Sequence, residues 1–146
     1  MHKFHVEHSQ IVKAQKDAVF KAATDYESVP KWSKFYTSVQ VTKKDGNTSQ
    51  LLVETQAFGM KEKGPSTAIA TPPARVELKG NPAEFVRDAV LNLEDTPDGN
   101  TKLSYTTDLE IRGVLATILG PLEKHRVEAL VRDEIKSFAS YVESMK

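Results

Sequence analysis

Turn sequences divide the middle of the chain into short segments, and no other feature constrains the fold as much. Asp45-Gly46-Asn47, Pro72-Pro73, Gly80-Asn81-Pro82 and the T-P-D-G-N stretch at 96–100 separate runs that are rich in β-forming residues. Glycine and asparagine adopt the backbone angles of tight turns, and proline cannot join the interior of a strand ladder. Strands joined by such short turns pair mostly antiparallel, so the sequence predicts an antiparallel sheet.

The predicted strands follow these turns. Alternation is clearest at 75–79, where Val76 and Leu78 share one face. We expect a further reversal at Gly59 and the K-E-K-G-P stretch, and a change of phase at Ile11 predicts a bulge near the end of the first strand. The predicted strands are Phe4–Val12, Tyr36–Lys44, Ser49–Phe58, Ser66–Thr71, Arg75–Lys79, Glu84–Leu93 and Thr101–Ile111.

Helical patterns lie on either side of this β region. Gln15–Asp25 is amphipathic, and Ser28–Ser33 reads as a helical turn in which Pro30 occupies an early position. In the last third, Gly120-Pro121 separates a short apolar segment, Val114–Leu119, from a long helix that begins at about Pro121. One face of that long helix carries an apolar stripe of Val127, Val131, Ile135, Phe138, Val142 and Met145.

Composition limits the classes of function. The chain of 146 residues is of a size for a single domain, 1–146, and its 20 basic and 20 acidic residues give a formal net charge of zero. A neutral chain has no general attraction to a nucleic-acid backbone, so we expect no nucleic-acid partner. The absence of cysteine excludes disulfides and thiolate chemistry, and we expect a cytoplasmic protein. We expect neither a membrane span nor an export signal, because no apolar run is long enough.

The order of elements predicts an α+β fold in which a curved antiparallel β-sheet wraps around a long C-terminal helix. Two short helices lie between the first and second strands. Only the last helix is long enough to cover much of the apolar face of such a sheet. A bent sheet and a straight helix do not match in shape, so we expect a gap between them that an apolar ligand can fill.

Four stretches resemble a known superfamily. They are I-V-K-A-Q-K-D-A-V-F at 11–20, D-Y-E-S-V-P-K-W at 25–32, A-T-P-P-A-R-V-E-L-K-G at 70–80 and L-E-D-T-P-D-G-N-T-K-L-S-Y at 93–105. Their order and spacing resemble those of the START-like, polyketide-cyclase and lipid-transport superfamily (SRPBCC), which has the helix-grip fold. The coenzyme-Q-binding and polyketide-cyclase-like branches are the most similar. The resemblance implies a hydrophobic ligand but not one function, because the superfamily includes carriers, receptors, chaperones and cyclases.

The candidate ligand-binding residues are large apolar or aromatic side chains on the predicted inner face. Trp32, the only tryptophan, is a candidate wall of the cavity mouth, with a packing role as the alternative. Tyr105 lies on an inward phase and its hydroxyl needs a partner. For the other candidates, the alternative to lining the cavity is an ordinary position in the hydrophobic core. The remaining candidates are Phe58, Ile69, Leu78, Phe85, Leu91, Leu109 and Leu122.

Few residues are candidates for chemistry. Arg87 falls on an apolar strand phase, where a charge must be paired or reach water. His8 lies on the phase of Val6, and it, Arg87 and Tyr105 are the weak catalytic candidates. His2, His5 and His8 make a poor three-histidine metal site, because His5 faces the opposite side of the strand. We expect no metal and no cofactor, and we expect His125 to be exposed.

Three functions remain open. The first is a non-catalytic carrier or chaperone for a lipid, isoprenoid quinone or polyketide-like molecule. The second is an enzyme of the cyclase/dehydratase kind, which would act through Arg87, Tyr105 or His8 by shaping its substrate and donating hydrogen bonds. The third is a protein-interaction module with a filled interior, whose exposed patch would be Val114–Leu119. We favour the carrier, since the sequence contains no nucleophile elbow or metal motif. The ligand, the oligomeric state and the source organism stay open.

Overall fold

The computed structural model describes residues 2–57, 60–80, 85–111 and 123–145. Its α+β architecture is the predicted helix-grip fold, a curved antiparallel sheet with a long C-terminal helix. The helices are α1 (Lys16–Ala23), η1 (Tyr26–Lys31) and α3 (Glu123–Ser144). The strands are β1 (His2–Val12), β2 (Tyr36–Asp45), β3 (Thr48–Ala57), β4 (Met60–Thr71), β5 (Arg75–Gly80), β6 (Phe85–Asp95) and β7 (Thr101–Ile111).

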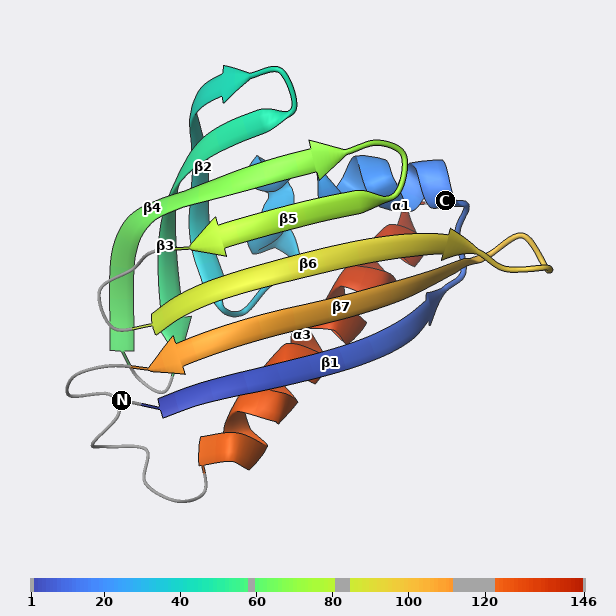
Figure 1. Cartoon of the computed structure of the whole chain (residues 1–146). Coiled ribbons are helices and arrows are strands. Elements are labelled where there is room, and N and C mark those ends of the chain that lie inside the picture. The colour runs from blue at the N-terminus through green and yellow to red at the C-terminus, as the bar shows by residue number, and fades with distance from the viewer. Residues whose placement is uncertain (1, 58–59, 81–84, 112–122, 146) are drawn as a thin grey trace.

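The strands form one sheet in the order β1-β7-β6-β5-β4-β3-β2, and every neighbouring pair is antiparallel. Consecutive strands from β2 to β7 are therefore hairpin neighbours, and β1 joins the free side of β7. Figure 1 shows the sheet curving around α3, with α1 and η1 on the same side of the sheet as α3. No helix in the described part of the chain is both long and apolar enough to cross a bilayer.

Two hydrophobic clusters pack between the sheet and the helices. The first gathers Phe35, Leu51 and Leu109 with the first half of α3, and the second gathers Val19, Leu103 and the second half of α3. Tyr105 packs against both clusters. The stripe predicted for α3 accounts for this division. Its buried members are Val127, Val131, Ile135, Phe138 and Val142.

The end of that stripe was predicted wrongly. Met145 follows the last residue of α3, Ser144, and is 61% exposed. Residues past a helix end no longer keep the helical spacing, so Met145 does not continue the buried face. The predicted helix start at Pro121 and the predicted segment Val114–Leu119 lie outside the described residues.

The β2–β3 hairpin confirms the turn predicted at 45–47. Gly46 has a φ of +61°, a backbone conformation that favours glycine because it has no Cβ. The bulge predicted at Ile11 is wrong. β1 pairs with β7 without a shift in register from His2 to Val12, and Ile11 is simply exposed. The irregularities lie in β2 instead, near Tyr36 and Val41.

The K-E-K-G-P stretch is not a turn but the first half of β4, opposite β3. Pro65 lies opposite Leu52 of β3, and the described pairing of β4 with β5 covers residues 66–71. Pro30 also differs from expectation. It lies near the end of η1 rather than at its start.

Candidate functional site

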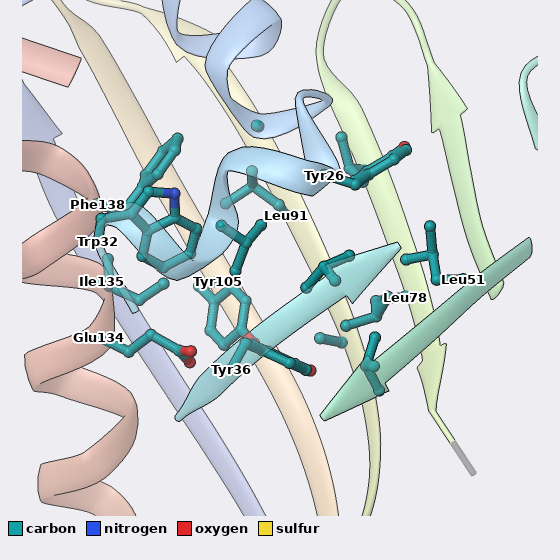
Figure 2. Close-up of a pocket in the computed structure, with 16 residues that line it drawn as sticks. Tyr26, Trp32, Tyr36, Leu51, Leu78, Leu91, Tyr105, Glu134, Ile135 and Phe138 are labelled. Atoms are coloured by element: carbon teal, nitrogen blue, oxygen red, sulfur yellow. The ribbon is translucent and has the colours of Figure 1, made fainter. Parts of the chain in front are cut away.

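A pocket opens where the two hydrophobic clusters meet, between the concave face of the sheet, η1 and α3. Its walls come from both clusters, since Leu51 and Val53 belong to the first and Ile135 and Phe138 to the second. Figure 2 shows these side chains converging on one space from the sheet, η1 and α3. The lining residues are Ala23, Tyr26, Val29, Trp32, Tyr36, Val39, Leu51, Val53, Val76, Leu78, Ala89, Leu91, Tyr105, Glu134, Ile135 and Phe138.

The pocket has a volume of about 110 Å³. An engineered apolar cavity of about 150 Å³ stays dry and binds benzene, whereas pockets for drug-sized ligands measure roughly 300–1,000 Å³. The described space therefore fits a body of about the size of one small ring. A longer molecule would insert only one of its ends into this pocket.

Among the described residues that line the pocket, Glu134 is the only acidic one. It lies on the buried face of α3, four residues before Phe138 and seven after Val127, and is 6% exposed. Ser33 Oγ donates a hydrogen bond of 2.8 Å to Glu134 Oε1. The same Oγ accepts hydrogen bonds from the backbone N–H groups of Phe35 and Tyr36. A buried carboxylate is thus tied to the segment between η1 and β2.

Trp32 forms another wall of the pocket, directly after η1. Its ring meets the ring of Phe138 edge to face, with 5.0 Å between centroids and 62° between planes. The backbone N–H groups of Trp32 and Ser33 both bond to the carbonyl of Val29. The position of the indole is therefore fixed from the backbone and by the aromatic contact. Its Nε1 atom is buried and has no hydrogen-bond acceptor among the described residues.

Three tyrosines bring hydroxyl groups to the lining: Tyr26 from η1, Tyr36 from β2 and Tyr105 from β7. Burial raises the pKa of Tyr26 above its ordinary 10.0, so this hydroxyl stays protonated at neutral pH. Tyr36 stacks edge to face on Phe35, with ring centroids 4.9 Å apart. In Figure 2 Tyr105 and Tyr36 lie on the side of the pocket where Glu134 enters.

Four of the residues proposed from the sequence line this pocket: Trp32, Leu78, Leu91 and Tyr105. Two others do not. Ile69 alternates with the fully buried Ala68 along β4, so its side chain is on the opposite face of the sheet. Leu109 is buried in the first cluster, which also contains Val127 and Val131, and does not line the pocket. Phe58 and Leu122 lie outside the described residues, as does the side chain of Phe85.

Of the polar candidates proposed from the sequence, His8 lies away from the pocket and the side chain of Arg87 is not described. His8 is half-buried and its Nε2 lies 3.3 Å from Gln10 Oε1, but it does not line the pocket. The backbone of Arg87 pairs with Leu109, and its side chain lies outside those described. His125 is exposed, as expected. Within the described ranges no three His, Asp or Glu side chains come close enough to hold a metal ion.

Tyr26, Tyr36 and Glu134 also line the pocket, although none of them was a candidate from the sequence. For Glu134 a signal was present. A carboxylate falls within the apolar stripe of the long helix, and a charge on such a face must be paired. Tyr36 and Tyr26 carried no comparable signal, because tyrosine is common on both faces of strands and in helical turns.

Two comparisons with known proteins concern the sequence itself. The family model described as polyketide cyclase/dehydrase and lipid transport matches residues 3–143. A search of curated proteins gives no significant match.

Solved structures with this fold come from several bacteria. TTHA0849 from Thermus thermophilus has a TM-score of 0.84 at 15% identity, over 98% of this chain and 99% of that one. A START superfamily protein from Mycobacterium smegmatis has a TM-score of 0.82 at 16% identity, over 97% and 99%. The Zhui aromatase/cyclase from Streptomyces sp. R1128 has 0.79 at 18% identity, over 99% and 93%. At sequence identities of 15–18%, these similarities show that the chain shares the fold of these proteins.

Proposed function

We propose, from the premise that the chain belongs to the polyketide cyclase/dehydrase and lipid transport family, that it binds a small hydrophobic ligand. The site is the pocket between the sheet, η1 and α3. The family includes both carriers and enzymes by its description, so the geometry of the pocket must support the choice between them.

One observation carries the proposal: the interior contains a pocket with walls that are almost entirely hydrocarbon and aromatic. Side chains around an empty apolar space lose the dispersion contacts that they would make in a filled core. A water molecule forms few hydrogen bonds in such a space, because it needs two to four polar partners. An apolar guest restores the lost contacts and leaves water itself, so it is the occupant that this lining favours.

The volume of the pocket limits the size of the ligand group that it can hold. At about 110 Å³ it accepts a small ring or a short branched chain. A lipid, an isoprenoid quinone or a polyketide-like molecule would enter with one end. The proposed ligand class is therefore a hydrophobic molecule with a compact terminal group.

Thermal unfolding with a panel of ring compounds, quinones and lipids tests this proposal. A ligand that binds only the folded protein adds about 2.7 kcal/mol at 100 times its Kd, and the Tm rises. Ala89→Leu places extra methyl groups in the pocket and should abolish the shift. Val90→Leu is the matched control, because Val90 is the next residue of β6 and faces the other side of the sheet.

Two results would count against the proposal. One is a panel in which no compound raises the Tm of the unmodified protein. The other is a shift that survives unchanged in Ala89→Leu, because the ligand would then bind elsewhere.

A second candidate function is an enzyme of the cyclase/dehydratase kind. The observation in its favour is that the Glu134 carboxylate and Tyr105 lie on the same side of the pocket. A carboxylate and a phenol beside a bound carbonyl compound are groups suited to general acid–base chemistry. Glu134→Gln and Tyr105→Phe separate the alternatives: an enzyme loses turnover of a cyclisable substrate while it still binds, and a carrier shows no turnover at all. The filled interior that an interaction module required is not favoured by the pocket.

A further inference from the structure

The walls of the pocket differ in how firmly they are held. The strands of the concave wall are joined to their neighbours by rows of backbone hydrogen bonds. α3 contributes its buried face to both hydrophobic clusters and is bonded to Ser33 through Glu134. η1, in contrast, has no buried residue. Segments with few buried contacts open most readily, so η1 is the wall that costs the least free energy to displace.

η1 separates the pocket from solvent by a single layer. Tyr26 and Val29 line the pocket, yet each is only half-buried. Figure 2 shows Tyr26 at the opposite end of the pocket from Phe138, whereas Trp32 lies beside Phe138. η1 therefore runs along the pocket, and its displacement would enlarge the space that a ligand can fill.

The two ends of η1 are not held equally. After its C-terminal end, the ring of Trp32 packs on Phe138 and the hydroxyl of Ser33 is bonded to Glu134. At its N-terminal end, Asp25 forms no side-chain cap. The first turn of η1 is therefore the part that can move, and Trp32 and Ser33 are its fixed end.

One hydrogen bond joins η1 to the sheet within the described residues. Glu27 Oε2 accepts it from the backbone N–H of Val41, over 3.1 Å and at an exposed site. Val41 belongs to β2, which is the last strand in the order of the sheet. Glu27 thus bonds to the edge strand. If η1 moves away, water replaces Glu27 as the acceptor, so the movement leaves no buried group without a partner.

The volume of the pocket gives this hydrogen bond a consequence for binding. About 110 Å³ holds one small ring. A larger ligand fits only if a wall yields, and displacement of η1 breaks the bond between Glu27 and Val41. The free energy of that bond then weakens the binding of a large ligand and leaves the binding of a small one unchanged, because only the large ligand requires the displaced state.

We propose that η1 is the adjustable wall of the pocket, and that the hydrogen bond from Val41 N–H to Glu27 limits the size of the ligand that the pocket accepts. This inference rests on the proposed function, because it requires that the pocket binds a ligand. It adds a residue that controls ligand size without touching the ligand.

Benzene and naphthalene are the probes, one within the described volume and one beyond it, with Kd measured by NMR titration. Glu27→Ala removes the acceptor, and a net hydrogen bond is worth roughly a factor of 2–10. Naphthalene should therefore bind about 2–10 times more tightly to this variant. Benzene should keep its Kd within about twofold, which also shows that the variant is folded. Loss of a purely structural contact would not tighten the binding of either probe.

Two further variants control this comparison. Glu27→Gln retains an oxygen acceptor, so the gain in affinity for naphthalene should be smaller than in Glu27→Ala. Lys31→Ala is the matched control, because Lys31 is also an exposed charged residue of η1 but lies next to the fixed end. Its Kd values for both probes should stay within about twofold of those of the unmodified protein.

Hydrogen exchange at the Val41 amide follows the same contact without a substitution. Naphthalene should speed the exchange of this N–H with water, because the displaced η1 no longer protects it, and benzene should not. The amide of Tyr36 is the internal control. It donates to Ser33 Oγ at the fixed end of η1, so its exchange rate should stay the same with either probe.

The outcomes separate this inference from the proposed function. If benzene binds but Glu27→Ala leaves the affinity for naphthalene unchanged or lower, the limit set by Glu27 is wrong and the hydrophobic pocket stands. The same holds if naphthalene binds without faster exchange at Val41. If neither probe binds to any of these proteins, the proposed function fails and this inference fails with it.

Discussion

Ser33 and Glu134 are 101 positions apart in the sequence, and their side chains meet in the interior through a hydrogen bond of 2.8 Å. This contact joins the segment after η1 to the middle of α3, at the wall of the pocket. Ser33 also accepts hydrogen bonds from the backbone N–H groups of Phe35 and of Tyr36, the first residue of β2. One hydroxyl therefore connects a helix, a turn and a strand that all border the pocket.

Ser33→Ala should lower the free energy of unfolding by about 1–3 kcal/mol, because a buried carboxylate loses a donor and two N–H groups lose an acceptor. Urea denaturation measures the change. Ser28→Ala is the control: Ser28 donates to Asp25 at an exposed site, and its loss should stay within about 0.5 kcal/mol. A Ser33→Ala protein as stable as the Ser28→Ala protein would show that this contact does not hold η1 to α3.

Leu78→Ala should enlarge the pocket and change the size of ligand that it prefers. Leu78 lines the pocket, and truncation of a well-buried leucine costs about 2–5 kcal/mol; its partial exposure places the loss at the low end. The affinity for naphthalene relative to benzene should rise. Leu109→Ala is the matched control, since Leu109 is 2% exposed but lies outside the pocket. If Leu78→Ala and Leu109→Ala change the affinity for naphthalene relative to benzene equally, the assignment of Leu78 to the pocket lining is contradicted.

Thr101 is the first residue of β7, and its side chain bonds to the segment that precedes α1. It is fully buried, and its hydroxyl donates a hydrogen bond of 2.8 Å to the backbone carbonyl of Ala14. Thr101→Val keeps the shape but leaves that carbonyl without its donor, so the free energy of unfolding should fall by about 1–3 kcal/mol. Thr101→Ser retains the hydroxyl and should lose less. The prediction is contradicted if the serine variant is the less stable of the two by urea denaturation.

His5 gives a pH-dependent contribution on the outer face of the sheet. Its Nδ1 lies 2.7 Å from Asp108 Oδ1, and this hydrogen bond is the main cause that raises the pKa of His5 above its ordinary 6.5. A raised pKa in the folded state means that the stabilisation is complete below about pH 6.5 and is lost as the pH rises through the folded-state pKa. NMR titration of the imidazole protons should show a pKa above 6.5 in the folded protein.

Asp108→Asn should lower the pKa of His5 toward 6.5, because it removes both the carboxylate acceptor and its charge. Glu7→Gln is a weaker test of the same effect, since Glu7 Oε2 is 3.8 Å from His5 Nε2. A His5 pKa that does not respond to Asp108→Asn would show that the pair is not formed in solution.

The sheet and its hairpins were predictable because turn residues act locally. Gly46 takes a positive φ where the sequence predicts a turn, and the two prolines after Thr71 end β4. The first half of β4 was missed because Gly64 and Pro65 are turn residues by local preference, whereas their pairing with Val53 and Leu52 of β3 is a tertiary feature.

The candidate site was harder to predict than the fold. Strand phase decides which residues face the pocket, and phase depends on register with neighbouring strands. Ile69 and Ala68 are adjacent, and only the pairing in the sheet shows that Ala68 is the one that faces inward. Leu109 is buried, as the strand pattern predicts, but it belongs to the first hydrophobic cluster, with Val127, and does not line the pocket. The path of a helix across a sheet is a tertiary feature that no strand pattern contains.

The location of a bound ligand tests the central claim most directly. Intermolecular NOEs should be measured between ethylbenzene, at saturating concentration, and the methyl groups of the isotope-labelled protein. Binding between the sheet and α3 predicts NOEs to Leu78, Leu91 and Ile135 together, since all three line the pocket. NOEs confined to exposed methyl groups such as that of Ile11, or no binding at all, would contradict the claim.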